Sequence, residues 1–150
     1  MKETTERPIY TLDIRVYYED TDFGGVVYYA NYLKFMERAR TEYLRTLGFD
    51  QSQLFDMQRR MFVVRSANLE FVSPARFDDV LSVTAEVVNV RRASLEFEQR
   101  CTAKRSASGK IAGGSSSDLV ATGKILIACL DADSFKPCAI PGALKMVLDS

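Results

Sequence analysis

Apolar and polar residues alternate along residues 10–18, where the even positions are apolar or aromatic: Tyr10, Leu12, Ile14, Val16 and Tyr18. Because successive side chains of a strand point to opposite faces of a sheet, this alternation predicts a half-buried strand. Residues 20–25 combine acidic residues with glycines and predict a turn. A helix is predicted next, starting between Val26 and Asn31 and ending near Leu47, because apolar residues recur there at helical spacing.

Apolar residues cover more than half of the circumference of this predicted helix. That distribution favours a helix wrapped by a curved sheet over one that lies on a flat face. Gly48 follows the last apolar position and indicates the end of the helix. The basic residues predict a flank exposed to solvent: Lys34, Arg38, Arg40 and Arg45. A short second helix is predicted over residues 51–58.

Strand patterns dominate the second half of the chain, over residues 62–72, 79–90, 94–104 and 119–130. The third of these segments places four residues on one face: Leu95, Phe97, Gln99 and Cys101. Residues 105–118 are rich in glycine and serine and predict a mobile hairpin connection, and a short helix is expected in the tail after Phe135. One long helix against a mainly antiparallel sheet predicts an α+β fold.

Length and charge narrow the possible functions. The 150 residues predict a single domain over residues 1–150. The formal net charge is zero, so the overall charge gives no reason to expect a nucleic-acid partner. No apolar run approaches the ~20 residues of a membrane span. The polar start of the sequence lacks the apolar segment of a signal peptide, so a cytoplasmic location is expected.

The chain contains no histidine, which excludes Ser-His-Asp and Cys-His catalytic triads. The three cysteines have no metal-ligand spacing, so no metal site is predicted. Cys101 and Cys129 lie in strand patterns and are interpreted as buried apolar residues. Acid and base chemistry near neutral pH must then come from other side chains or from backbone dipoles.

Asp22 lies between the first predicted strand and the predicted long helix. Free N–H groups at a helix start and the helix dipole stabilise developing negative charge. A carboxylate beside such an oxyanion site is what acyl-transfer chemistry requires. Aspartate is also common as a turn or helix cap, so spacing alone leaves a structural role open for both Asp20 and Asp22.

The sequence resembles hotdog-fold acyl-CoA thioesterases of the 4-hydroxybenzoyl-CoA thioesterase type, particularly the subfamily encoded with the Tol-Pal envelope system. The resemblance extends over about residues 15–141. Its most specific part is RVYYEDTD at residues 15–22, followed by GVVY at 25–28, ANYL at 30–33 and ERARTE at 37–42. The later match SPARFDD, at residues 73–79, mainly supports the fold.

The resemblance implies a hotdog fold, in which a curved antiparallel sheet wraps around one long central helix. It also implies a homodimer or homotetramer with active sites at the dimer interface. Asp22 would act as nucleophile or general base on a thioester, and the backbone N–H of Tyr29 would polarise its carbonyl. The other implied substrate contacts come from the loop and from a later turn: Gly25, Val26, Tyr28, Arg91 and Arg92. Coenzyme A would enter as part of the substrate, with no separate cofactor.

Three positions depart from the family pattern. Tyr29 replaces a histidine usual in the Tol-Pal-associated subfamily, although the 4-hydroxybenzoyl-CoA branch has tyrosine there. Ala93 stands where that branch has a lysine that contacts the nucleotide, and Cys138 stands where a basic residue is common.

The resemblance implies hydrolysis of an acyl-CoA thioester to a carboxylic acid and coenzyme A. Two alternatives stay open: a thioesterase that acts on acyl carrier protein, and a non-catalytic domain that binds acyl-CoA. Aromatic, short aliphatic and medium-chain acyl groups all remain compatible with the sequence.

Overall fold

The computed structural model describes residues 9–104 and 118–149. The elements follow in the order β1 (Tyr10–Arg15), a 3-10 turn (Tyr18–Asp20), α1 (Asn31–Thr46), α2 (Gln51–Gln58), β2 (Arg60–Phe71), β3 (Val80–Val90), β4 (Ser94–Lys104), β5 (Asp118–Asp131) and α3 (Gly142–Asp149). The expected connection at 105–118 lies outside the described residues, except for Asp118. No helix in the described ranges has the length and apolar character needed to cross a membrane.

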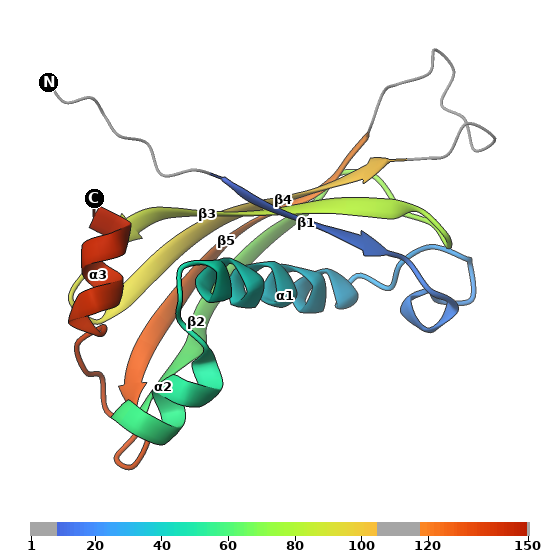
Figure 1. The fold of residues 1–150 in the computed structure, drawn as a ribbon. Helices are drawn as coiled ribbons and strands as arrows, with labels where there is room; N and C mark the ends of the chain where they lie inside the picture. Colours follow the sequence, from blue (N-terminus) through green and yellow to red (C-terminus); the bar gives the residue numbers. More distant parts are fainter. Residues whose placement is uncertain (1–8, 105–117, 150) are drawn as a thin grey trace, which may run out of the picture.

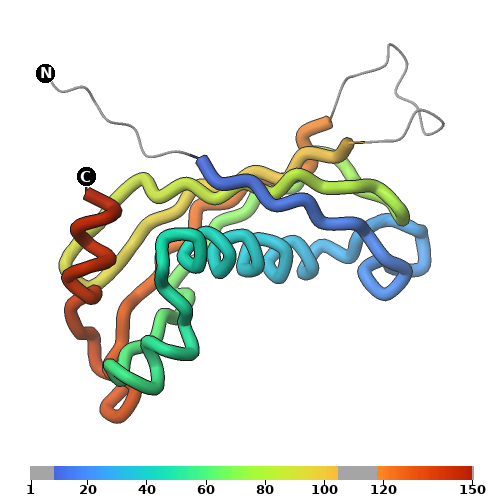
Figure 2. Tube along the Cα trace, in the orientation of Figure 1, coloured from blue at the N-terminus to red at the C-terminus, as the bar shows by residue number. Residues whose placement is uncertain are grey.

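The strands form one antiparallel sheet in the order β1-β3-β4-β5-β2. Figure 1 shows that this sheet is curved and that α1 lies along its concave side. The same arrangement is visible in the trace of Figure 2, where α3 stands at one end of the sheet. Helix α1 has 16 residues, and α2 and α3 have 8 each. The predicted α+β architecture with a curved sheet is therefore confirmed.

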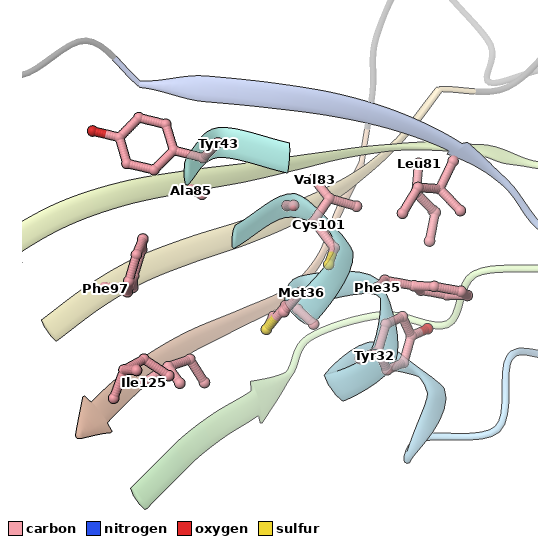
Figure 3. Close-up of a cluster of buried hydrophobic side chains, with 14 of the residues drawn as sticks. Tyr32, Phe35, Met36, Tyr43, Leu81, Val83, Ala85, Phe97, Cys101 and Ile125 are labelled. Carbon is pink, nitrogen blue, oxygen red and sulfur yellow. The ribbon is translucent and has the colours of Figure 1, made fainter. Parts of the chain in front are cut away.

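The core lies between α1 and the concave face of the sheet. The helix contributes a buried row of side chains: Tyr32, Phe35, Met36, Ala39 and Tyr43. Figure 3 shows Tyr32, Phe35, Met36 and Tyr43 of this row beside Leu81 and Val83 of β3 and Phe97 of β4. The helix also approaches β5 closely, because a Cβ atom at Gly123 would lie 2.9 Å from the Met36 sulfur. Glycine at this position lets the sheet wrap tightly around α1.

Arg40 corrects one sequence-based prediction, because it is buried and does not lie on a solvent-exposed flank. Its Nη1 donates to Gln99 Oε1 at 2.9 Å. Gln99 Nε2 in turn donates to the carbonyl oxygens of Met36 and Thr84, each at 3.0 Å. Burial lowers the pKa of Arg40 to about 10, while the Glu37 charge raises it. The prediction failed because the curved sheet also covers the side of the helix that carries Arg40.

Tyr18 corrects a second prediction, that the first strand extends over residues 10–18. Strand β1 ends at Arg15, and Tyr18 begins the 3-10 turn with 77% of its surface exposed. The Tyr17 N–H donates to Asp20 Oδ2 at 2.8 Å and curls the chain away from the strand. The Tyr18 ring instead stacks on Phe77 with centroids 4.3 Å apart.

Candidate active site

The loop before α1 is a tight, internally bonded turn. The Asp22 N–H donates to Val26 O, and the Gly25 N–H donates to Asp22 O, both at 2.9 Å. Gly25 has a φ of 81°, a left-handed conformation that glycine adopts with little strain. The Val27 N–H donates to Ala75 O at 2.8 Å, which ties the loop to the segment before β3. The loop conformation is therefore fixed by backbone bonds, with Asp22 at its turn.

The Asp22 side chain is exposed to solvent. Its Oδ1 accepts the Gly24 N–H at 2.9 Å, which fixes the direction of the carboxylate. Within residues 9–104 and 118–149, its Oδ2 accepts no hydrogen bond. One carboxylate oxygen is thus held in place, and the other is left without a hydrogen bond in the described part of the chain. Asp20 differs, because its Oδ2 accepts the Tyr17 N–H and its carbonyl oxygen accepts from Asn31 Nδ2 at 2.9 Å.

The start of α1 leaves a backbone donor available. The N–H groups of Asn31, Tyr32 and Leu33 donate to the carbonyl oxygens three residues earlier, at 2.8, 3.2 and 3.2 Å. The Tyr29 N–H finds no acceptor in the described part of the chain. Such a donor at a helix start is suited to bind an anion or a polarised carbonyl. The Asp22 carboxylate and this N–H belong to one loop.

The loop carries exposed aromatic side chains, and one of them contacts the end of β2. The Tyr29 ring is 60% exposed and contacts the rings of Tyr28 and Phe71, with centroid distances of 4.9 and 5.8 Å. Phe23 is fully exposed, and Val72 is 56% exposed. Phe71 ends β2, which is an edge strand in the described sheet. The loop and this end of β2 therefore share an exposed apolar surface.

The other predicted contacts lie at different places. Val26 is half-buried and bridges to Arg76, whereas Tyr28 is exposed and its N–H donates to Asp20 O at 2.9 Å. Arg91 and Arg92 are exposed in the turn between β3 and β4, at the opposite end of the sheet from the loop (Figure 1). The 11 residues of β3 separate the two places by roughly 35 Å. The structure brings Gly25 and Val26 to Asp22 through backbone hydrogen bonds and keeps Tyr28 and Tyr29 in the same loop, whereas the two arginines of the same protomer lie apart.

A cavity of about 510 Å³ runs beside α1, between the helix and the strands β2, β4 and β5. Its walls are mostly apolar, and the charged residues in its lining are Lys34, Glu37 and Arg40. It begins near Leu33, which lies within the first turn of α1. The sequence pattern does not reveal this cavity, because its lining comes from five elements that only the fold brings together: α1, α2, β2, β4 and β5. The only feature of the sequence that points to a cavity here is the wide apolar face of the predicted long helix.

Comparisons with known proteins identify the family. The sequence model of the Thioesterase superfamily matches residues 24–109. The acyl-CoA thioesterase YbgC of Haemophilus influenzae is 41% identical over 136 residues, which cover 91% of this chain and 91% of that protein. The chain belongs to the thioesterase superfamily.

Solved structures agree with this assignment. The crystal structure of a probable thioesterase from Bartonella henselae superposes with a TM-score of 0.76 at 32% identity, covering 89% of this thioesterase and all of that chain. The gentisyl-coenzyme A thioesterase BH1999 superposes with a TM-score of 0.73 at 26% identity, covering 90% and 98% of the two chains. The resemblance to hotdog-fold thioesterases is therefore confirmed, and this protein is a thioester hydrolase.

Proposed function

We propose that this thioesterase hydrolyses acyl-CoA thioesters to a free carboxylic acid and coenzyme A. The substrate class is supported by the 41% identical relative, which is named an acyl-CoA thioesterase and matches 91% of this chain. The observation that carries the proposal is the pairing in one loop of an exposed Asp22 carboxylate with the Tyr29 N–H, for which the described residues supply no acceptor. A nucleophile or base beside a preorganised donor is the arrangement that thioester cleavage requires.

The thioester carbonyl would accept a hydrogen bond from the Tyr29 N–H, with the dipole of α1 aligned behind it. Asp22 Oδ2 then either attacks the carbonyl carbon or removes a proton from an attacking water. Attack expels the coenzyme A thiolate and leaves a mixed anhydride, which water hydrolyses to the acid and regenerated Asp22. In both routes the bond between the carbonyl carbon and sulfur breaks, and the thiolate takes up a proton.

A second copy of the chain would complete the site. The outer edge of β2 lacks a partner strand in the described sheet, and exposed Tyr29, Phe71 and Val72 lie beside it. Unpaired strand edges and exposed apolar patches mark contact surfaces. A homodimer, or a homotetramer built from such dimers, would cover this surface. It would also allow Arg91 and Arg92 of the second copy to bind the coenzyme A phosphates, to which guanidinium groups are well suited.

The first test is release of free thiol from a panel of acyl-CoAs, from acetyl to palmitoyl with benzoyl and 4-hydroxybenzoyl. We expect Asp22→Asn to lower turnover at least ~10²-fold, because the variant can neither attack nor accept a proton. Its melting temperature should match that of the parent, since the side chain is exposed. Asp78→Asn is the matched control, an exposed carboxylate whose one ion pair among the described residues is with Arg15, at 3.5 Å. An Asp22→Asn variant as active as the parent would disprove this mechanism.

Subunit mixing tests the contribution of a second copy. An Asp22→Asn subunit and an Arg91→Ala, Arg92→Ala subunit should each be poorly active alone. Mixed after joint refolding, they should recover activity, because a heterodimer contains one site with intact Asp22 and both arginines. Recovery would approach roughly half of the parent site activity in those heterodimers. Activity that stays at the level of the separate variants would refute the shared site.

A further inference from the structure

Two thiols lie side by side at the end of β5. Cys129 belongs to this strand, and Cys138 lies in the segment that leads to α3. Their Sγ atoms are 3.8 Å apart, and both residues are free thiols in this structure. The remaining cysteine, Cys101, pairs in register with Ala121, which lies roughly 27 Å along β5 from Cys129. Only the Cys129 and Cys138 thiols therefore lie within reach of one another.

Backbone pairing holds these two thiols in register. The Cys138 N–H donates to Cys129 O at 2.9 Å, and Leu130 forms an antiparallel bridge with Pro137. Opposite residues in a hydrogen-bonded antiparallel pair have Cα atoms about 5.5 Å apart. That separation falls inside the roughly 4.4–6.8 Å at which disulfides form. Rotation of the two side chains can therefore close the bond while the backbone keeps its pairing.

The two thiols differ in exposure. Cys138 is partly exposed, whereas Cys129 is fully buried. Burial raises the pKa of the Cys129 thiol to about 12, with a further contribution from its hydrogen bond to Cys138. A thiol must be accessible and deprotonated to attack a disulfide. Cys138 is therefore the residue that meets an oxidant, and Cys129 the residue that resolves the product.

We propose that Cys129 and Cys138 form an oxidation site that a small-molecule disulfide converts into an intramolecular disulfide. The Cys138 thiol gives up its proton, and its thiolate attacks one sulfur of the small disulfide and displaces the other half as a thiolate. The Cys129 thiol then passes its proton to the thiolate released in the first step, and its sulfur attacks Cys138 Sγ and releases the second half as a thiolate. The protein loses two protons and two electrons, and the small disulfide is reduced to two thiols.

The bond would fix the segment that carries Cys138 against the turn between β3 and β4. The Ile140 N–H donates to Arg92 O at 2.8 Å, and the Cys129 N–H donates to Ala93 O at 2.9 Å. Residues on both sides of the thiol pair thus already bind this turn. Oxidation would therefore reduce the mobility of the turn that carries Arg91 and Arg92. Slower hydrogen exchange at the Ile140 amide is the expected sign of this effect.

The test is incubation of the purified protein with oxidised glutathione, followed by thiol titration, intact mass and peptide mapping. We expect the three thiols to fall to a single one, with a mass lower by two hydrogens and a peptide that joins Cys129 to Cys138. The melting temperature should rise by roughly 5 °C and return to its starting value after treatment with dithiothreitol. Three remaining thiols, or a glutathione adduct that persists on Cys138, would overturn the proposal.

Three variants test the assignment of each sulfur. Cys138→Ser should abolish the loss of thiols, and its half-buried position makes the replacement tolerable for folding. Cys129→Ala should accumulate the glutathione adduct on Cys138, because the resolving thiol is gone. Cys101→Ala is the matched control, since it removes a buried thiol far from the pair and should still form the bond. Loss of two thiols from Cys138→Ser would contradict the proposed pair.

Discussion

The loop before α1 and the middle of α1 each carry a charged side chain, but in opposite surroundings. Asp22 is exposed, and one of its oxygens accepts no hydrogen bond in the described residues. Arg40 is 7% exposed, and Gln99 binds both its guanidinium and the backbone of two elements. The first group is available to react with a ligand, whereas the second joins the helix to β3 and β4.

Because of this difference, variants at the two places should affect different properties, activity at the exposed group and stability at the buried one. An exposed group can be changed at little cost to folding, because water solvates either side chain. A buried charge that loses its hydrogen-bond partner remains desolvated, and the folded state bears the cost. Variants at Asp22 should therefore change turnover alone, and variants at Gln99 should change mainly the free energy of unfolding.

The largest effect on stability is expected for Gln99→Leu. The change removes the acceptor of Arg40 Nη1 and the donor to Met36 O and Thr84 O. We expect the free energy of unfolding to fall by about 3 kcal/mol, measured by urea denaturation. Turnover per folded molecule should stay within about twofold of the parent, because Asp22 is untouched.

The double variant Arg40→Met, Gln99→Leu sharpens this prediction. With the buried charge removed as well, apolar side chains of similar size fill the space, and much of the lost stability should return. A double variant that is less stable than Gln99→Leu alone would show that Arg40 stabilises the fold through contacts other than this hydrogen bond.

A smaller effect on stability is expected for Gly25→Ala in the loop, and the neighbouring Gly24→Ala serves as its control. Gly25 has a φ of 81°, and a Cβ there would meet no atom within 4 Å, so Gly25→Ala adds backbone strain alone. We expect a loss of about 1 kcal/mol in unfolding free energy, and a drop in turnover because the Asp22 turn shifts. At Gly24, a Cβ would lie 3.5 Å from Asp22 Oδ1, an ordinary contact. Equal effects of Gly24→Ala and Gly25→Ala would rule out strain as the cause.

The contrast between the exposed Asp22 and the buried Arg40 also explains which features could be predicted from the sequence. Alternation located the strands well, and β4 spans residues 94–104 as expected, because each strand has one buried face. Helical spacing located α1 but assigned Arg40 to solvent, since the pattern does not reveal how far a sheet curves around a helix. The pattern also could not place Arg91 and Arg92, because their distance from Asp22 within one chain depends on the length of β3.

The turn after β5 shares one feature with the Asp22 turn, a carboxylate oxygen that accepts the N–H two residues later, and a variant there has the smallest predicted effect. Asp131 Oδ1 accepts the N–H groups of Asp133 and Ser134 at 2.8 and 2.9 Å. The Ser134 N–H, followed by the Asp133 N–H, lowers the pKa of Asp131 below its usual value. A carboxylate with a lowered pKa adds stability above its unfolded pKa of about 3.9, and that stability is lost as pH falls through the folded pKa.

Asp131→Asn keeps an acceptor oxygen at this turn but removes the charge. Its melting temperature should therefore lie below that of the parent near pH 7, and the gap should narrow as the pH falls below about 4. The exposed position keeps the gap small. Asp56→Asn is the control, because the Asp56 carboxylate accepts no hydrogen bond in the described ranges. A gap for Asp131→Asn that is constant with pH would mean that the turn needs the shape of the side chain and not its charge. The Asp22 turn, in which Oδ1 also accepts the N–H two residues later, would then likewise need the side-chain shape alone, which leaves the Asp22 charge available for chemistry.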